Sequence, residues 1–417
     1  MILKLAWRNV WRNRRRTLIN VVSIALGVWL TVTSVGLADY SYHQMIDDSA
    51  RMGLGHVTIQ PTGYLEAPSL KKTITQAATL REAIASRPKT QVRAAATRIT
   101  GQTMFASASK SVGGSFLAID PRQESRDINI FLRSLVEGEV FTSSDARAIV
   151  VGDVLAKNLK LSLGRKLILT AVDKSGEVVS ELFRVSGIFR TGVAEIDGRM
   201  AMLPIDRARK MLHYAPTEAT MISVFIDDYR NAARVRDLLS ELIHASKDDS
   251  IATATWRQTQ PELASLSDVD RGMNYLFLLL LGLLIAAGVL NTSLMSVLER
   301  RHEFGIMMAI GTRPKQLAAM ILTEAASMGF VGLAAGALLC VPWAYYLITV
   351  GLDMSSVTGE DYTAANVLID PIWHITLYPE RMLTIAIILF ALTLIASLYP
   401  AFTAARARPI ETLRDAA

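Results

Sequence analysis

The sequence ERRHEFGIMMAIGTRPKQL, residues 299–317, directly follows 27 residues that contain no Asp, Glu, Lys or Arg. A helix needs about 20 apolar residues to cross the hydrocarbon core of a bilayer, so the uncharged run 272–298 predicts a transmembrane helix. The polar segment Glu299 to Glu303 then ends this run. The apolar stretch that follows, Gly305 to Ile310, is too short to span a membrane and needs another explanation.

Three further runs lack these four charged residue types: 17–38, 325–352 and 382–405. Each is long enough to span, so the sequence predicts four transmembrane helices. The alternative is a set of buried helices in a large soluble core, but such helices rarely lack charge over so many residues. About 230 residues of ordinary composition separate the first two runs, which is enough to form a core of their own.

The segment between the first two runs alternates predicted strands with short helices. Residues 220–227, 229–245 and 250–258 predict a strand, a helix and a second strand, which indicates a βαβ unit. Residues 91–101 and 102–109 predict two separate strands, with a turn where the first ends in glycine. We therefore expect an α-helical membrane protein with a large mixed α+β domain, in two subdomains, inserted between its first and second spans.

The distribution of charge predicts the orientation. Basic residues gather in 1–16, 299–317 and 406–417, whereas the loop 353–381 is acidic. The positive-inside rule then places both termini and the 299–317 loop in the cytoplasm, and the large domain outside. Residues 1–16 predict an amphipathic helix at the membrane interface, anchored by Trp7, Arg8, Trp11 and Arg12. Anionic lipid headgroups explain its charge, so no nucleic-acid partner is needed.

The predicted organisation follows from these runs. The first apolar run is longer than that of a signal peptide, so we expect a retained anchor instead of a cleaved leader. The expected segments are the N-terminal amphipathic helix 1–16, span 17–38, the external domain 39–271 with helical stalks 40–52 and 259–271, span 272–298, the cytoplasmic loop 299–324, span 325–352, the external loop 353–381, span 382–405 and the cytoplasmic tail 406–417.

The sequence lacks the motifs of several kinds of binding and catalytic site. The nearest fragment to a phosphate-binding loop begins at Gly164 but has Leu167 where a hydroxyl residue is needed. Six dispersed histidines and a single cysteine, Cys340, predict neither a metal site nor an intrachain disulfide. We expect no catalytic residues and no cofactor in this chain. The spans hold no ionisable group except the thiol, which argues against ion coupling.

One polar group lies inside the second predicted span, at residues 291–293. Asn291, Thr292 and Ser293 are small polar residues, and such residues commonly form hydrogen bonds between membrane helices. A polar contact to substrate is the alternative interpretation.

The cytoplasmic segment resembles a family motif. E-x-x-x-E-x-G followed by A-x-G and a small residue occurs between the second and third spans of MacB/FtsX-type ABC transporter permeases. The N-terminal AWRNVWRNRRRTLINVVSIALGV and the C-terminal ARARPIETLR are similar to the same group, and the resemblance covers essentially the whole chain. The matching motif residues are Glu299, Glu303, Gly305, Ala309, Gly311 and Thr312.

The external domain is most similar to that of lipoprotein-releasing (LolC/LolE-like) permease subunits. The stretches GHVTIQP, FLAIDPRQE and IVVGDVLAKNLKLSLGRKLIL follow the pattern of that group in order. Two features depart from it: Arg165–Lys166 stands where the group usually has an acidic residue, and the N-terminal helix is rich in Arg and Trp. The cargo is therefore left open.

The resemblance implies that the 299–317 segment forms a coupling helix on a separate ATPase dimer, which binds ATP and Mg. The apolar side chains would fill a groove on the ATPase, the charged ones would lie at its rim, and Gly305 and Gly311 would permit tight turns. A plain amphipathic loop on the inner leaflet is the alternative. The implied coupling residues are Glu299, Arg300, Arg301, Glu303, Phe304, Gly305, Ile306, Met307, Met308, Ala309, Ile310, Gly311 and Thr312.

The implied function is that of a non-catalytic permease subunit in a bacterial inner membrane, with a MacB-like periplasmic domain. It would pair with a second copy or a homologous permease and contact lipids. ATP hydrolysis in the partner would move the periplasmic domain by mechanotransmission, extract a lipoprotein or another amphiphile from the outer leaflet, and pass it to a periplasmic carrier. The expected substrate cavity comprises Val28, Thr31, Val32, Val35, Leu280, Leu284, Ala287 and Asn291.

Two other functions are compatible with the same resemblance. One is efflux of peptides or drugs through an outer-membrane duct. The other is an FtsX-like regulator of a cell-wall hydrolase, in which nothing is transported. A membrane-anchored enzyme would need an external catalytic constellation, and the sequence offers none.

Overall fold

The computed structural model of the chain describes residues 11–12, 14–88, 92–245, 250–353, 363–364, 367–368 and 372–406. The chain divides into two compact units. The helical unit combines the chain up to Ser41 with 268–354 and the segment from Ile372 onward. The α/β unit combines 42–267 with 355–371.

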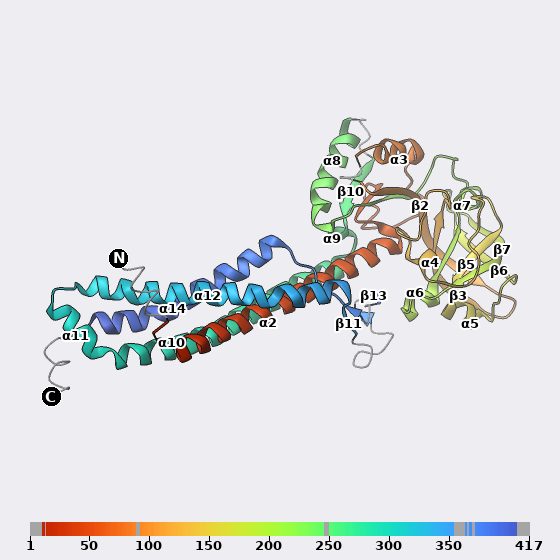
Figure 1. Cartoon of the computed structure of the whole chain (residues 1–417). Coiled ribbons are helices and arrows are strands. Elements are labelled where there is room, and N and C mark those ends of the chain that lie inside the picture. Colours follow the sequence, from red (N-terminus) through yellow and green to blue (C-terminus); the bar gives the residue numbers. More distant parts are fainter. Residues whose placement is uncertain are drawn as a thin grey trace. The chain divides into compact units, whose positions relative to one another are not determined.

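Over the residues that the structure describes, the helical unit contains four long helices and one short one (Figure 1). Among the described residues, the four long helices are apolar enough over a sufficient length to cross a membrane, as the sequence predicted. Both α2 and α10 also extend into the residue range of the α/β unit. The helices are α2 (Arg14–Ser49), α10 (Pro261–Glu299), α11 (Arg301–Ala309), α12 (Pro314–Thr349) and α14 (Pro379–Ala405).

The third long helix ends earlier than the sequence predicted. The third span was expected to reach residue 352, but α12 ends at Thr349, because Gly351 has a φ of 80° and turns the chain out of the helix. The segment 299–324, predicted as the cytoplasmic loop, includes the first turns of α12, which begins at Pro314. Proline is well suited to the first helical position, because its missing N–H has no acceptor there in any case.

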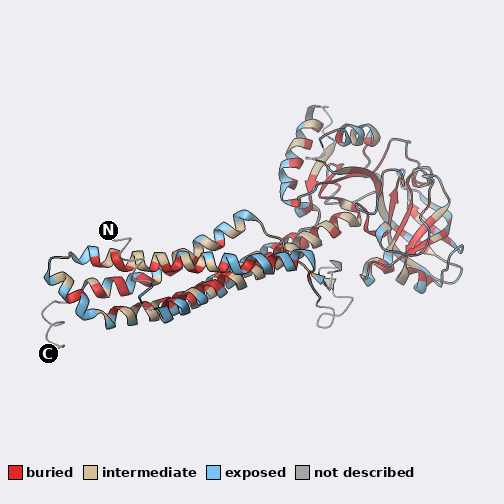
Figure 2. Ribbon diagram, viewed as in Figure 1, coloured by how far each residue is buried: buried red, intermediate tan, exposed pale blue. Residues whose placement is uncertain are grey.

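Small residues bring the long helices together. Gly27 of α2 lies against Ile285 of α10, and Gly332 of α12 lies against Ile24 of α2. Gly329 of α12 lies against the ring of Phe390 of α14. Such contacts replace the hydrophobic driving force that is absent between helices in lipid. Buried residues therefore alternate with outward-facing ones along each helix (Figure 2).

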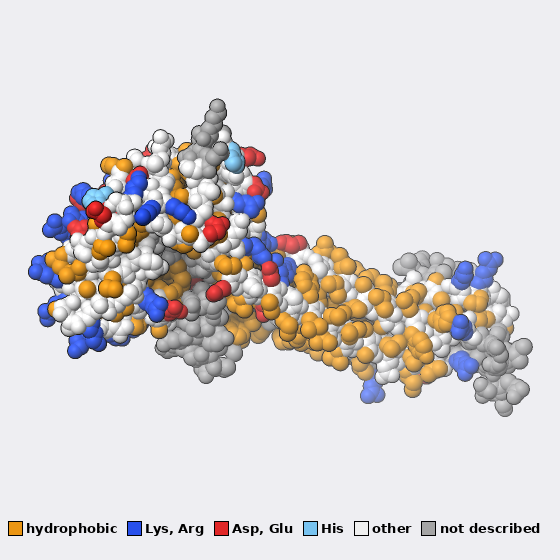
Figure 3. All heavy atoms as spheres, turned by 180° about the vertical axis from the view of Figure 1, so that it is seen from behind, with side chains coloured by type: hydrophobic (Ala, Val, Ile, Leu, Met, Phe, Trp, Pro, Cys, Tyr) orange, Lys and Arg blue, Asp and Glu red, His pale blue; other side chains and the backbone are white. Residues whose placement is uncertain are grey.

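The surface of the helical unit suits a membrane. One face is covered mainly by hydrophobic side chains, with Lys and Arg near the end that carries α11 (Figure 3). The exposed residues include Leu284 of α10, Leu338 of α12 and Leu383 of α14. A soluble protein rarely exposes apolar surface over so large an area, so this surface is expected to contact lipid or other membrane helices.

The strands β1 to β10 of the α/β unit pair into one connected network. Pairing runs from β2 through β3, β8, β5, β7 and β6 and returns to β2, which closes a ring. The strands are β1 (Val57–Pro61), β2 (Ala94–Ala106), β3 (Ser111–Ile119), β4 (Leu135–Gly138), β5 (Ala148–Gly152), β6 (Lys166–Val172), β7 (Val178–Phe189), β8 (Met200–Pro204), β9 (Met221–Phe225) and β10 (Ile251–Thr255).

Short helices connect these strands. The segment β9–α8–β10 forms the expected βαβ unit: both strands run antiparallel to β1, which lies between them, so they are parallel to each other. The connections are η1 (Ala50–Leu54), α3 (Ala77–Ala85), α4 (Ile130–Arg133), α5 (Asp153–Leu159), α6 (Ala194–Arg199), α7 (Ile205–Met211), η2 (Tyr229–Asn231), α8 (Ala232–Ala245) and α9 (Trp256–Thr259).

Four further strands have two residues each. They are β11 (Leu352–Asp353), β12 (Thr363–Ala364), β13 (Val367–Leu368) and β14 (Ile372–Trp373). They pair as β11 with β14 and β12 with β13, both antiparallel.

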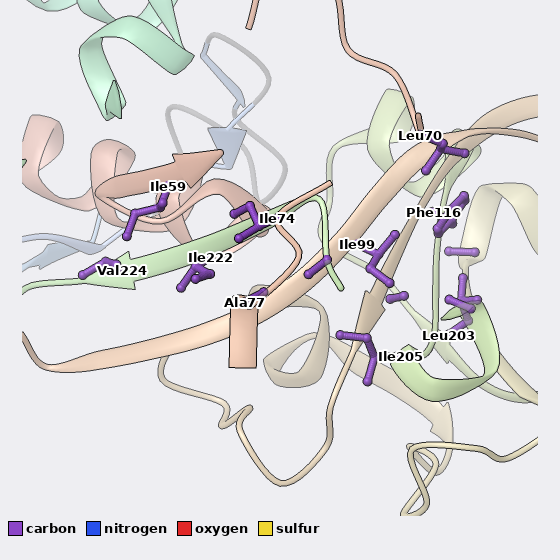
Figure 4. Close-up of a cluster of buried hydrophobic side chains, with 14 of the residues drawn as sticks. Ile59, Leu70, Ile74, Ala77, Ile99, Phe116, Leu203, Ile205, Ile222 and Val224 are labelled. Atoms are coloured by element: carbon purple, nitrogen blue, oxygen red, sulfur yellow. The ribbon is translucent and has the colours of Figure 1, made fainter. Parts of the chain in front are cut away.

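Two expectations for the α/β unit are corrected. The strands expected at 91–101 and 102–109 form the single strand β2. Gly101 lies inside this strand, where an added Cβ would clash with the side chain of Leu70. The unit was also expected to divide into two subdomains. Instead, β2 pairs with β9 through its first half and with β3 through its second half, and core side chains run continuously past it (Figure 4).

Candidate functional site

The helix α11 lies between α10 and α12 in the chain, and hydrogen bonds at its C-terminal end determine where it stops. Its last turn is closed by hydrogen bonds from the N–H of Gly311 to the carbonyl of Met308 (3.1 Å) and from the N–H of Thr312 to that of Met307 (3.0 Å). Gly311 has a φ of 105°, which glycine adopts without strain. Gly311 thus forms the expected tight turn, whereas Gly305 lies inside the helix and is buried.

One side of α11 packs into the chain's own core. The ring of Phe304 is only 1% exposed. The expectation that Phe304 fills a groove on a partner therefore changes, because the ring contributes to the helical unit itself. Met307 and Met308 are half-buried against the same cluster. The cluster around Phe304 consists of Val297 from α10, Leu317, Met320 and Ile321 from α12, and Ala401 and Ala404 from α14.

The other side of α11 is exposed. Ile310 is 81% exposed, and Ile306 and Ala309 are also exposed. Arg301 and Glu303 lie exposed on the same short helix. A cluster of exposed apolar side chains beside charged residues is typical of a protein contact surface. We call Ile306, Ala309 and Ile310 the α11 tip.

A chain of ion pairs fastens α11 to two other segments. Arg12, just before α2, donates to Glu303 at 2.8 Å. Arg300 donates through Nε to Glu303 at 3.1 Å and through a terminal nitrogen to Glu324 of α12 at 3.4 Å. The guanidinium of Arg300 also lies 5.1 Å from the ring centre of Phe304. Four charged side chains thus connect the start of α2, α11 and α12.

The ion pairs at the two ends of this series differ in their exposure to solvent. The Arg12 and Glu303 side chains are about half exposed, so their pair contributes little on its own. Arg300 and Glu324 are only 13% and 15% exposed, so each depends on its partner for charge compensation. Burial of Glu303 disfavours its charged form, but hydrogen bonds from Arg12 and Arg300 outweigh this and hold the pKa of Glu303 below its ordinary value.

A small polar pocket of about 100 Å³ lies behind this ion chain. Thr292 of α10 donates to Asn20 of α2 at 2.7 Å, an interhelical hydrogen bond of the kind that the sequence predicted for this polar group. Ser293 also lines the pocket, and its buried hydroxyl finds no hydrogen-bond partner among the described residues. Asn291 lies apart, on an exposed face of α10.

Two family models match the chain. Residues 17–242, more than half of the chain, match the MacB-like periplasmic core domain. Residues 275–409 match the FtsX-like permease C-terminal region. The chain belongs to the MacB/FtsX-type ABC transporter permeases. The second match includes α11 and the segments that carry most of its contacts.

The relatives of this permease have names that refer to different functions. It is 24% identical to the lipoprotein-releasing system transmembrane protein LolC of Neisseria meningitidis, over 78% of each chain. It is 26% identical to the pyoverdine export ATP-binding/permease protein PvdT of Pseudomonas syringae, over 86% of this chain but only 54% of that protein. An uncharacterized ABC transporter permease of Methanocaldococcus jannaschii is 24% identical over 99% of this chain and 97% of its own length.

Among solved structures, the permease is similar to the periplasmic region of MacB from Actinobacillus actinomycetemcomitans. The sequence identity is 15% and the TM-score is 0.38. The match covers 53% of this chain and 98% of that structure.

The predicted substrate-cavity residues do not come together within one permease chain. Val28, Val32 and Val35 of α2 are buried in the core of the helical unit. Thr31 is also buried, and its hydroxyl donates to the carbonyl of Gly27 at 2.8 Å. The predicted positions on α10, in contrast, form an outward stripe at helical spacing. This exposed stripe consists of Leu280, Leu284, Ala287 and Asn291.

The other predictions concern the residues at the membrane interface and the absence of a metal site. Trp7 and Arg8 lie outside the described residues, whereas Trp11 is about half exposed. In the described part of the permease, no three His, Cys, Asp or Glu side chains lie where they could hold a metal ion. Sequence reasoning missed Asn20 and Glu324. The available signal for Glu324 was a single acid immediately before the uncharged run 325–352.

Proposed function

We propose that this permease is the membrane subunit of a transporter driven by a separate ATPase dimer, which binds ATP and Mg. The observation that carries the proposal is the α11 tip, whose apolar side chains are exposed while the other side of the same helix is fixed in the core. Contact between these apolar side chains and water is unfavourable, and a groove on a cytoplasmic partner would cover them.

The charge near α11 supports a cytoplasmic position for it. Arg300, Arg301, Arg313 and Lys315 lie on or beside α11. By the positive-inside rule, this end of the helical unit and both termini lie in the cytoplasm, and the α/β unit lies on the opposite side of the inner membrane. In this arrangement the chain itself carries no nucleotide site, and the force comes from closure of the ATPase dimer.

Continuous helices would carry the force. The helix α10 runs without a break from Pro261 to Glu299, next to α11, and α2 runs from Arg14 to Ser49. Movement of α11 is passed to α10 through the core around Phe304 and to the start of α2 through Arg12 and Glu303. Closure in the cytoplasm thereby becomes a movement of the α/β unit, as in other two-state transitions driven by ligand binding.

The cargo we favour is a lipoprotein or a related amphiphile, taken from the outer leaflet and passed to a periplasmic carrier. The similarity to LolC over 78% of both chains supports this cargo. The exposed stripe of α10 would face a second permease, identical or homologous, and the acyl chains would lie between the two. The cavity would then belong to the pair of permeases, since one chain alone does not form it.

Export of a peptide or drug through an outer-membrane duct is the second candidate. The similarity to PvdT over 86% of this chain favours it. The two candidates differ in the phase from which the cargo is taken: lipid for the first and water for the second.

A reconstitution experiment tests both candidates. The permease and its ATPase are placed in proteoliposomes with a fluorescent triacylated lipoprotein, and ATP-dependent transfer to a soluble acceptor is measured. The proposal expects transfer that stops when ATP is omitted and when Leu284 is replaced by Arg. ATP hydrolysis without lipoprotein transfer, together with movement of pyoverdine, would favour export. Hydrolysis that moves neither cargo would contradict transport.

A further inference from the structure

A pocket of about 490 Å³ lies in the α/β unit, at an interruption along one edge of β2. On that edge β9 pairs with residues 94–98 and β6 pairs with residues 104–106. Residues 99–103 pair with β3 on the other edge of β2, but on this edge they pair with neither β9 nor β6. The pocket opens at this interruption and contacts Thr100, Gly101 and Gln102. Its volume is within the range of sites that bind small molecules.

The outer wall of the pocket is the segment 62–73, which is fixed by its own hydrogen bonds. The hydroxyl of Tyr64 donates to the carbonyl of Thr100 at 3.3 Å, and that of Tyr214 donates to the carbonyl of Leu70. The ammonium of Lys72 donates to carbonyls within the segment, at 3.1 Å for Ala67. The wall is therefore held in place without a ligand, and such preorganisation lowers the cost of binding.

The interior of the pocket is mainly apolar. Leu54, Leu65, Leu70, Val172 and Met221 line it, with neutral polar side chains such as Gln60 and Thr259 between them. Leu70 is also part of the core cluster drawn in Figure 4. Leu65 and Val172 are substantially exposed, although they face a concave surface. An apolar chain entering the pocket would remove these side chains from water, which is favourable by about 25 cal/mol for each Å² covered.

Two charged residues lie at this pocket, and only one is available to a ligand. The carboxylate of Asp173 accepts the backbone N–H groups of Ser175, Gly176 and Glu177 at 2.8–2.9 Å, and it lies 2.7 Å from the ring of His213. Hydrogen bonds from Ser175 and then His213 hold the pKa of Asp173 well below its ordinary value. Its charge is thus already compensated within the β6–β7 turn.

Lys71 is the available charge. Its side chain is exposed and passes over Gly176 of the same turn, where an added Cβ would come within 2.9 Å of Nζ. In the described parts of the chain, no acceptor is found within hydrogen-bonding distance of this ammonium group. The pocket therefore combines an apolar interior with one free positive charge at its mouth.

We propose that this pocket binds a single-chain anionic amphiphile, with the apolar chain against Leu65, Val172 and Met221 and the anionic head paired with Lys71. An apolar chain with a neutral head would gain only the first of these contacts, and a hydrophilic anion only the second. This binding site lies within the α/β unit, goes beyond the proposed transport function and needs neither the ATPase nor ATP.

Photo-crosslinking on the full chain in lipid nanodiscs tests the proposal. The probe is palmitic acid with a diazirine on its chain, and the labelled peptides are identified by mass spectrometry. We expect labelling of the segments that hold Leu65, Gln102 and Val172, in addition to labelling of the membrane helices by probe dissolved in lipid. Lys71→Glu should reduce the pocket labelling about fivefold, because an attractive exposed pair becomes repulsive. Leu65→Asp should reduce it further.

Matched variants and a second probe separate this outcome from unspecific labelling. Lys110→Glu makes the same charge change, and Leu163→Asp the same apolar-to-acid change, at exposed positions outside the pocket; both should label like the wild type. The methyl ester of the probe, which keeps the apolar contacts but not the pair with Lys71, should label the pocket more weakly than the acid does, while labelling the membrane helices as strongly. The proposal is overturned if the acid labels only the membrane helices, or if acid and ester label the pocket equally and Lys71→Glu has no effect.

Discussion

Arg300 donates a hydrogen bond to Glu324 across 3.4 Å, and this contact joins the end of α10 to α12 beside a polar pocket. The same guanidinium donates to Glu303 of α11 and lies over the ring of Phe304. One arginine therefore holds together the segments on both sides of the α11 tip. Its position makes the geometry of α11 dependent on the surrounding helices, which a force-transmitting contact requires.

Removal of Glu324 should destabilise the helical unit. Glu324→Ala leaves the charge of Arg300 without its buried partner, and the expected loss is about 3 kcal/mol in the free energy of unfolding. Arg300→Ala/Glu324→Ala should lose less than the sum of the single variants, because it removes both charges. Denaturant unfolding of the detergent-solubilised permease measures this. Strictly additive losses would show that the two side chains do not interact.

Ile310→Asp should release the ATPase from the purified complex without lowering the stability of the permease alone. Ile310 is 81% exposed, so the chain itself has no contact to lose, but a charge in an apolar groove of the partner is costly. Val178→Asp, at a position that is 73% exposed on the α/β unit, is the matched control and should keep the ATPase. Retention of the ATPase by both variants would contradict the assignment of the α11 tip.

Phe304→Ala should behave in the opposite way. The ring is buried in the core of the helical unit, and its removal should cost about 3–5 kcal/mol of stability through the cavity it leaves. We expect a lower melting temperature of the permease alone, before any ATPase is added. A variant that melts like the wild type but no longer binds the ATPase would instead place Phe304 in the partner's groove.

The stability of the α/β unit should depend on Asp173 in a defined pH range. Its pKa is lowered in the folded chain, so the stabilisation is fully present above the ordinary aspartate value of about 3.9 and is lost as pH falls through the folded-state pKa. Asp173→Asn should therefore lower the melting temperature at pH 7, and the difference from the wild type should shrink below about pH 4. Asp127→Asn, at an exposed carboxylate, serves as the control.

The long helices could be predicted because each requires only a local property, an uncharged run of sufficient length. The closed ring of strands could not, because the pairing of β2 with β6 joins residues that are far apart in sequence. Gly101 illustrates the difficulty: glycine suggested a turn, but the contact with Leu70 explains it within a strand.

The candidate site was only partly predictable for a related reason. The sequence shows that α11 is apolar, but not that Phe304 faces the chain's own helices while Ile310 faces outward. Likewise, Val32 and Leu284 are both apolar residues in predicted spans, yet one is buried and the other is 71% exposed. The choice between core, lipid and partner depends on the packing of neighbouring helices, which a single span does not encode.

The central claim is that the α11 tip and the α/β unit lie on opposite sides of the membrane. The sequence has one cysteine, Cys340, so Cys340→Ala provides a background without thiols. Ile310→Cys and Lys110→Cys are introduced separately and treated with a membrane-impermeant maleimide in right-side-out and inverted vesicles. We predict that Lys110→Cys is labelled only in right-side-out vesicles and Ile310→Cys only in inverted vesicles without the ATPase. Labelling of both positions from the same side would contradict the account.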